Sequence, residues 1–216
     1  VLVKSNQGNG AGGGVCSSIS SPTLNNVTFA DNIKNAESHA AGLHLMHGGN
    51  PLIINSTFVN NIITQDNLGF TSGAISIFNN SHPTLINTII YGNSSPAIHF
   101  HHAEEYNSLS SITISHSNVE GGEEEGILTI FDDLGEVFWG DGNLNEDPLF
   151  VSALTGTPSD YTLQDGSHCI DTGTTDTNGD GDADITDFNG LGPDMGSVES
   201  PYTAVTGCTD PEALNY

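Results

Sequence analysis

The stretch Pro22-Thr-Leu-Asn-Asn-Val-Thr-Phe29 decides the fold, because the chain repeats it. It returns 29 residues later as Pro51-Leu-Ile-Ile-Asn-Ser-Thr-Phe58, and a further 32 residues on as Pro83-Thr-Leu-Ile-Asn-Thr-Ile-Ile90. Another asparagine stands three residues after each copy: Asn32, Asn61 and Asn93. Self-similarity with a period near 30 residues is typical of solenoids, in which each repeat forms one coil.

Each copy has the pattern of a β-strand, because apolar and small polar residues alternate and β-branched residues are frequent. A second short strand is expected before each proline, at residues 14–15, 42–45 and 73–77, and a less regular fourth coil follows at 97–119. Such strands cannot bury a core alone, but coils stacked about 4.8 Å apart can. We therefore predict an all-β fold, a right-handed parallel β-helix over residues 1–138. Neither the dense leucines of leucine-rich repeats nor the 3.6-residue period of helical repeats is present.

Stacking would place equivalent residues above one another. Asn26, Asn55 and Asn87 are predicted to form a ladder in which each amide hydrogen-bonds the next, ending where His116 takes the position. Two apolar columns are predicted to fill the core: Leu24, Ile53, Leu85 and Ile114, and Phe29, Phe58, Ile90 and Val119.

The charge of the chain is strongly one-sided. Asp and Glu total 27, whereas the only basic side chains are Lys4 and Lys34, which gives a formal net charge of −25. Phosphate binding needs clustered Lys and Arg, so nucleic acids and anionic membranes are excluded as partners, and cations are favoured. No apolar run is long enough to span a bilayer, so no membrane insertion is expected.

One Asp-rich segment fits a calcium-binding loop. The oxygen-bearing side chains are spaced as in the EF-hand loop, with Gly181 at position 6, although position 12 is Asp instead of Glu. No amphipathic helices flank the segment, so it resembles the single Asp-rich loops of dockerins and thrombospondin type 3 repeats. An ion-free surface turn is the alternative, but crowded carboxylates without a cation repel one another. We expect Ca²⁺ to be held by Asp176, Asn178, Asp180, Asp182, Asp184 and Asp187.

The histidines suggest a second metal site, but their spacing opposes it. Alignment of the strands places His44, Ser76 and His99 in one outward column, and His47, Asn79 and His102 in another. Histidines two coils apart are about 10 Å from each other, too far to share one zinc ion. His101 shares a face with His99, but a third ligand is not evident, and an exposed polar face is the preferred interpretation. The acidic cluster within 120–136 is interpreted as a solvated loop.

The period is lost after residue 138, and a different set of phrases begins. Trp139-Gly-Asp-Gly-Asn143, Glu146-Asp-Pro-Leu-Phe150 and Gly192-Pro-Asp-Met-Gly196 occur in this order. They resemble the terminal region, often called the choice-of-anchor type, of bacterial secreted right-handed parallel β-helix proteins, over about residues 11–199. We expect residues 139–200 to form an irregular Asp/Gly-rich C-terminal cap.

The last segment, 201–216, is expected to be a linker and the start of a truncated repeat. Gly207-Cys-Thr-Asp-Pro211 and the residues to Tyr216 resemble the beginning of a Cys-containing repeat of secreted marine bacterial proteins. The resemblance implies that Cys208 pairs with a cysteine further downstream, and that the protein is extracellular or on the bacterial cell surface, where disulfides persist. With Cys16 and Cys169 the count is odd, which indicates a free thiol or a partner outside the segment. We expect the chain to be a piece of a longer polypeptide.

Two functions fit these observations. The first is a non-catalytic structural or adhesive surface module that binds calcium, contacts a glycan or surface ligand through its loops, and self-associates end to end into a fibre. The second is a polysaccharide-active β-helix enzyme, a lyase or glycoside hydrolase. Lyases and hydrolases that act on uronic acids use Arg or Lys, and this chain has no Arg, so we favour the first and assign no catalytic residues.

Overall fold

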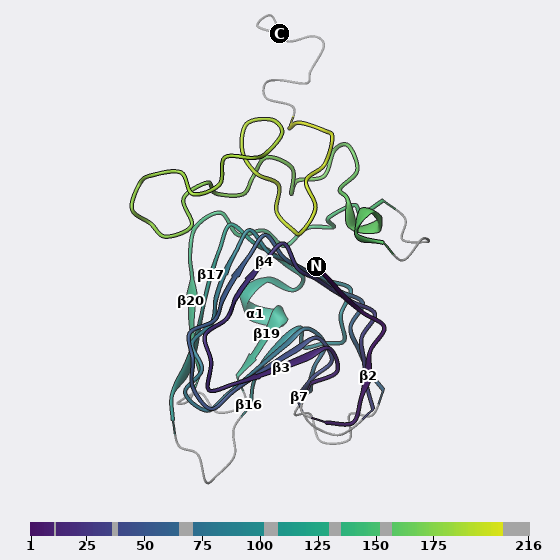
Figure 1. Ribbon diagram of the computed structural model, residues 1–216, viewed down its shortest axis with the longest axis vertical. Coiled ribbons are helices and arrows are strands. Elements are labelled where there is room, and N and C mark those ends of the chain that lie inside the picture. Colours follow the sequence, from purple (N-terminus) through teal and green to yellow (C-terminus); the bar gives the residue numbers. More distant parts are fainter. Residues whose placement is uncertain are drawn as a thin grey trace, which may run out of the picture.

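The fold is a parallel β-helix of about four turns, seen along its axis in Figure 1. The computed structural model describes residues 1–10, 12–35, 39–64, 71–101, 108–129, 135–151 and 157–204. The segment 205–216, with Cys208, therefore lies outside the described residues, as do His102 and residues 130–134 of the acidic segment within 120–136. The prediction that this acidic segment is a loop is wrong for its first part, which forms a short helix at residues 122–126. No helix in the described part is long and apolar enough to cross a membrane.

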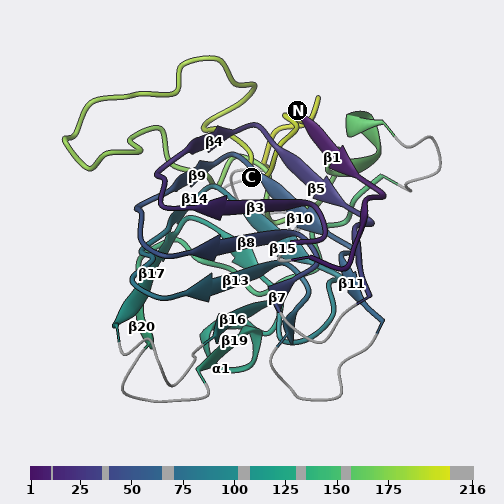
Figure 2. The ribbon, with the colours of Figure 1, turned by 60° about the horizontal axis from the view of Figure 1, so that its bottom comes forward.

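Three five-stranded parallel sheets form the sides of the coils (Figure 2). Sheet A contains β1 (Leu2–Lys4), β5 (Thr28–Ala30), β10 (Thr57–Val59), β15 (Ile89–Tyr91) and β18 (Asn118–Val119). Sheet D contains β3 (Val15–Ser18), β8 (Leu43–Met46), β13 (Ile75–Phe78), β16 (Ile98–His101) and β19 (Ile127–Thr129). Sheet E contains β4 (Thr23–Asn25), β9 (Leu52–Ile54), β14 (Thr84–Ile86), β17 (Ser110–Ser115) and β20 (Gly135–Trp139).

Two smaller sheets and two short helices complete the described elements. The strands are β2 (Gln7–Gly8), β6 (Ile33–Lys34) and β11 (Ile62–Ile63) in one small sheet, and β7 (His39–Ala40) and β12 (Thr71–Ser72) in the other. The helices are α1 (Gly122–Gly126) and a 3₁₀ turn, η1 (Pro158–Tyr161).

The apolar columns predicted from the repeat are confirmed by the register of the sheets. Leu24, Ile53, Leu85 and Ile114 are successive partners in sheet E. Phe29, Phe58, Ile90 and Val119 are successive partners in sheet A. The rings of Phe29 and Phe58 stack with centroids 4.5 Å apart and an interplanar angle of 3°. The interior of the solenoid is thus a set of like-on-like contacts along its axis.

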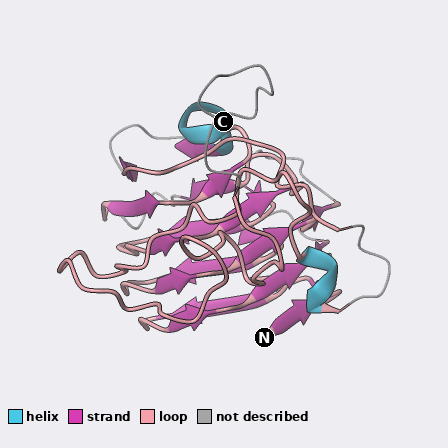
Figure 3. Cartoon of the chain, turned by 90° about the horizontal axis from the view of Figure 1, so that it is seen from above, coloured by secondary structure: helices cyan, strands magenta, loops and turns pink. Residues whose placement is uncertain are grey.

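The two ends of the stack of coils differ (Figure 3). At the N-terminal end the outer strands are β1, β3 and β4, and the partly buried Val3, Val15 and Leu24 complete the core columns. At the other end α1 lies across the last coil, inside the outline seen in Figure 1, and Ile127 after it joins the core. The helix carries three acidic residues, Glu123, Glu124 and Glu125.

The C-terminal segment 139–204 covers the side of the solenoid instead of its end (Figure 1). Leu163, Cys169, Ile170 and Met195 pack on Ile89, and Tyr161 packs on Ala30 and Val59. Sheet A needs this cover because Ala30, Val59 and Ile89 are apolar side chains on its outer face.

The expectation of an exposed histidine face on sheet D is wrong. His44, Ser76 and His99 are in register and alternate with core residues, as the alignment predicted. All three are nonetheless 0 % exposed. The neighbouring strands β7 and β12 bring His39 and Ser72 against this outer face, so its polar side chains are buried.

Candidate functional site

The predicted calcium ligands lie on one exposed loop. Hydrogen bonds from the backbone of the loop to its own carboxylates hold its shape. The Asp176 carboxylate accepts backbone N–H hydrogen bonds from Gly179 at 2.7 Å and Gly181 at 2.8 Å. These bonds, with that from Gly181 the strongest contributor, lower the pKa of Asp176, because they stabilise its charged form. Gly179 and Gly181 have φ of 78° and 91°, which glycine tolerates, so the loop can turn tightly around Asp176.

The other predicted ligands continue the same turn. Asn178 Oδ1 accepts the Asp180 N–H, and Asp180 Oδ1 accepts the Asp182 N–H, each at 2.9 Å. Asp184 closes the loop by accepting both the N–H and the hydroxyl of Thr177 at 2.8 Å. The sequence thus brings five of the six residues into one turn. As they stand, no three acidic, His or Cys side chains among the described residues form a group that would hold a metal.

A polar cleft of about 540 Å³ separates this loop from the solenoid. Asp184, Asp187 and Glu199 line it on one side, and the amides of Asn26 and Asn55 line it on the other. Asp187, the sixth predicted ligand, therefore lies beside the loop along this cleft. Burial raises the pKa of the Glu199 carboxyl, which accepts backbone N–H bonds from Asn189 and Asp194.

The predicted asparagine ladder has one side-chain rung. Asn26, Asn55 and Asn87 occupy equivalent corners after β4, β9 and β14, with φ of 54°, 46° and 50°. Asn87 Nδ2 donates to Asn55 Oδ1 at 3.0 Å. Asn87 also accepts the Thr174 N–H and donates to its carbonyl, both at 2.8 Å, so its amide joins the C-terminal segment to the solenoid.

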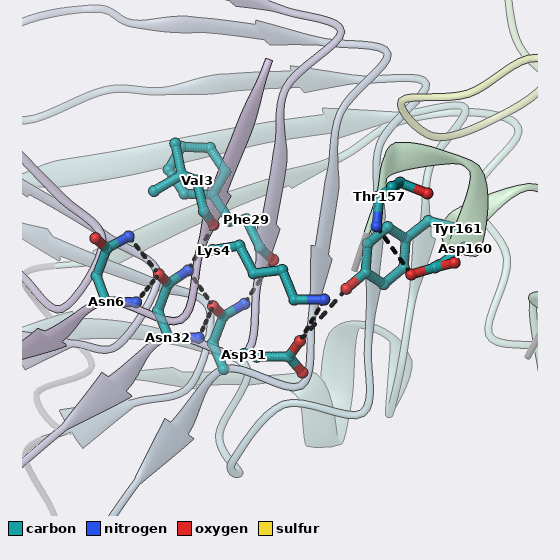
Figure 4. Close-up of polar contacts among 10 residues, drawn as sticks. Val3, Lys4, Asn6, Phe29, Asp31, Asn32, Thr157, Asp160 and Tyr161 are labelled. Atoms are coloured by element: carbon teal, nitrogen blue, oxygen red, sulfur yellow. Dashed lines mark hydrogen bonds and ion pairs between the residues drawn. The ribbon is translucent and has the colours of Figure 1, made fainter. Parts of the chain in front are cut away.

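A longer ladder runs through the asparagines that follow the phrases. Asn6 donates to Asn32, Asn32 to Asn61, and Asn61 to Asn93, at 2.9, 2.8 and 2.8 Å. Asn32 and Asn61 are 0 % exposed, and each also donates to a backbone carbonyl. The repeated spacing of Asn32, Asn61 and Asn93 was the sequence signal for this ladder. Figure 4 shows its first rung, from Asn6 to Asn32.

Both basic side chains have partners within the chain, Lys4 in a partly exposed ion pair and Lys34 in a buried hydrogen bond. Lys4 Nζ lies 3.3 Å from Asp31 Oδ2 and 5.9 Å from the centre of the Tyr161 ring (Figure 4). Lys34 is 0 % exposed, and its ammonium donates to the Gly10 carbonyl. Neither lysine is therefore placed to grip an acidic sugar.

Four histidine rings gather on the outer face of sheet D. The ring centroids of His39 and His44 are 4.1 Å apart, and those of His39 and His101 are 5.2 Å apart. His99 follows at 6.1 Å from His101. Burial lowers the pKa of His39 to about 4 and that of His44 to about 2, so both rings are neutral at physiological pH.

The two described cysteines are unpaired. Cys16 is exposed on β3, with its thiol 3.7 Å from the Met46 sulfur. Cys169 belongs to the C-terminal segment and is buried against Ile89 of sheet A, and burial raises the pKa of its thiol to about 12. Cys169 is therefore a packing residue without thiolate reactivity at neutral pH.

The family comparison supports the fold. The family model described as "Right handed beta helix region" matches residues 1–133. A solved structure described as "Crystal structure of pectate lyase Pel9A" matches with 14 % identity and a TM-score of 0.35. The match covers 92 % of this chain and 69 % of that one. No curated protein matches.

The family match spans more than half of the chain and coincides with the stacked coils. The chain therefore belongs to the right-handed β-helix family. Proteins of one fold carry different functions, so the site must decide what this member does.

Proposed function

We propose that this chain is a non-catalytic structural or adhesive module of a bacterial cell surface, and that it binds Ca²⁺ at the Asp176–Asp187 loop. The observation that carries the proposal is the engagement of both lysines, Lys4 with Asp31 and Lys34 with the Gly10 carbonyl. Apart from Asp31, the carboxylates on the described surface then have no lysine to neutralise them. Such a surface attracts divalent cations and repels acidic polymers.

The loop supports calcium through its shape. Its backbone already turns around the Asp176 carboxylate, and Asp180, Asp182 and Asp184 are all exposed. Ca²⁺ takes six to eight oxygen ligands in flexible geometries, so small rotations of exposed side chains would suffice to complete a site.

Calorimetric titration with Ca²⁺ tests the loop. We expect one Ca²⁺ per chain and a higher Tm in its presence, because a ligand that binds only the folded state stabilises it. Asp180→Asn should weaken binding, since Asp180 stands at position 5 of the loop, where the EF-hand loop uses a side-chain oxygen. Asp165→Asn is the matched control, because it removes the same charge from an exposed position outside the loop. Equal loss in both variants, or no binding by the wild type, would refute calcium binding at this loop.

Self-association through the ends of the solenoid is part of the same proposal. The edges of β1, β3 and β4 at the N-terminal end are suited to pair with a further coil. At the opposite end, α1 and its three glutamates cover the last coil, which opposes head-to-tail stacking. A fibre would require α1 to be displaced. Light scattering at increasing concentration with Ca²⁺ distinguishes filaments from a dimer or a monomer.

A polysaccharide-active enzyme is the second candidate, and the cleft beside the loop favours it. Asp184, Asp187 and Glu199 line this cleft opposite asparagine amides, a mixture that suits a neutral glycan. A screen on neutral and uronic polysaccharides tests it. Cleavage that Asp187→Asn abolishes would replace the first proposal, whereas glycan binding without cleavage would identify the cleft as an adhesive site.

A further inference from the structure

The histidine cluster on sheet D is the most unusual polar feature of the solenoid. His44 and His99 extend from β8 and β16 and are 0 % exposed. His39 reaches them from β7, 4.1 Å from the ring of His44 and 5.2 Å from that of His101. The spacing of the repeat gave no third imidazole for a metal site. His39 supplies it from β7, a strand outside the three main sheets.

Two nitrogen atoms of this cluster are buried without a hydrogen-bond partner among the described residues, His39 Nδ1 and His44 Nε2. An unsatisfied buried polar atom costs about 1–3 kcal/mol, so it needs an explanation such as an ion or a water molecule. On the other side of the ring, His44 Nδ1 lies 3.2 Å from Ser76 Oγ. If the ring donates there, Nε2 keeps its lone pair, as in metal-binding histidines held by an outer partner.

We propose that His39, His44 and His101 bind one divalent transition-metal ion on the outer face of sheet D. Neutral imidazole nitrogen is a preferred ligand of Zn²⁺, Cu²⁺ and Ni²⁺, whereas Ca²⁺ prefers oxygen. This site is therefore distinct from the Asp-rich loop in both place and chemistry.

One pair of rings already has the separation of two ligands on one ion, whereas a second pair must rotate. With metal–nitrogen bonds of about 2.0–2.1 Å, two imidazoles on one tetrahedral ion have centroids about 5 Å apart. His39 and His101 already meet this separation at 5.2 Å and 85°. His39 and His44 are closer, at 4.1 Å and 31°, and must turn apart. As the rings stand, no three of the described His, Cys, Asp or Glu side chains converge on one point, so the site closes only when the metal enters.

The protonation states around the cluster have opposite effects on metal binding. Burial keeps His39 and His44 neutral, with pKa values of about 4 and about 2, which leaves their lone pairs available at pH 7. Lys34 is the opposing charge, since it contributes to the low pKa of both histidines. Burial also lowers the pKa of Lys34, which makes loss of its proton easier when a metal ion binds.

Titration of the metal-free chain with Co²⁺ tests the proposal. Excess Ca²⁺ is present throughout, so that the Asp-rich loop does not take up the probe. We expect one Co²⁺ per chain, with the strong visible absorption of a low-coordinate site rich in nitrogen, and displacement by Zn²⁺. His39→Gln and His44→Gln should each weaken Co²⁺ binding by at least about 10-fold, and Ser76→Ala by about 10-fold through the orientation of His44.

His168→Gln is the matched control, because His168 is an exposed histidine outside sheet D. Circular dichroism without metal establishes that each variant is folded, and His39→Gln, at a less buried position, keeps the test valid if His44→Gln unfolds. No Co²⁺ absorption by the wild type would overturn the proposal. Binding that is unchanged in His39→Gln, or reduced equally in His168→Gln, would overturn it as well.

Discussion

Asparagine has two roles at the corners of this solenoid, and the hydrogen bonds separate them. Asn26, Asn55 and Asn87 have φ between 46° and 54°, a left-handed conformation that asparagine tolerates better than most residues. Asn32 and Asn61 are instead buried, and each side-chain amide hydrogen-bonds the coils on either side of it. Asparagine therefore recurs in the first column because of its backbone conformation, and in the second column because of its side-chain hydrogen bonds.

Replacement of Asn61 should be costly. Asn61→Ala removes the bonds of its amide to Asn32, Asn93 and the Phe29 carbonyl, and leaves these buried groups unsatisfied. We expect a loss of about 2–4 kcal/mol in the free energy of unfolding, measured by urea denaturation. Asn26→Gly is the control, since glycine keeps the left-handed corner at an exposed position, and should stay within about 0.5 kcal/mol of the wild type. Similar losses in the two variants would refute the distinction between the columns.

The histidine cluster should make the metal-free protein sensitive to mild acid. Burial lowers the pKa of His39 to about 4 and that of His44 to about 2, against 6.5 for a free side chain. Below pH 6.5 the unfolded chain therefore binds protons that the folded chain excludes, and stability falls as pH falls. The slope approaches about 1.4 kcal/mol per pH unit for each histidine.

Urea denaturation between pH 6.5 and 5 measures this slope before most carboxylates titrate. His39→Gln should flatten the profile, whereas His168→Gln, at an exposed histidine, should leave its shape unchanged. His47, His101 and Lys34 act on the same rings, so the slope also depends on their charge. A wild-type profile that is flat over this range would contradict burial of neutral rings.

At the scale of the elements, the C-terminal segment is held to sheet A by apolar packing and by Asn87. The side-chain amide of Asn87 bonds both backbone groups of Thr174, and the backbone carbonyl of Asn87 accepts the Gly196 N–H at 2.8 Å. Residues more than eighty positions apart thus form one corner, which no periodicity within the solenoid predicts.

Asn87→Ala should release this corner. We expect faster hydrogen exchange at the Gly173, Met195 and Gly196 amides, whose bonds lie within or beside the segment, and little change in β14. Asn55→Ala is the matched control, because its φ of 46° imposes the same strain on alanine while only one side-chain bond is lost. Equal exchange of the segment in both variants would show that packing alone holds it.

The sequence was sufficient for the elements that repeat. Phe29 above Phe58 and Ile53 above Leu85 follow from the period alone, because like positions must stack in a solenoid. The burial of His44 did not follow, since the strand that covers it, β7, lies in a polar stretch without a strand pattern. The lateral position of the C-terminal segment was also missed, although Val59 and Ile89, the apolar side chains on the outer face of sheet A, indicated that a cover was needed.

At the scale of the whole molecule, the charge is almost uncompensated. The formal net charge is −25, and within the described residues Lys4–Asp31 is the only ion pair between a lysine and a carboxylate. Repulsion among carboxylates therefore outweighs attraction, and it should be relieved by any added salt.

Stability should accordingly rise with ionic strength. Between about 0.01 and 0.15 M salt the Debye length falls from about 30 to about 8 Å, which screens most of the carboxylate repulsion. Each kcal/mol of repulsion relieved should raise Tm by about 2–4 °C in a chain of this size.

NaCl and tetramethylammonium chloride should act equally, because screening does not depend on the cation. CaCl₂ at the same ionic strength should raise Tm further in the wild type and by a smaller increment in Asp180→Asn, since only calcium uses the loop. A Tm that stays constant or falls with NaCl would mean that attractive pairs, and not repulsion, dominate this surface.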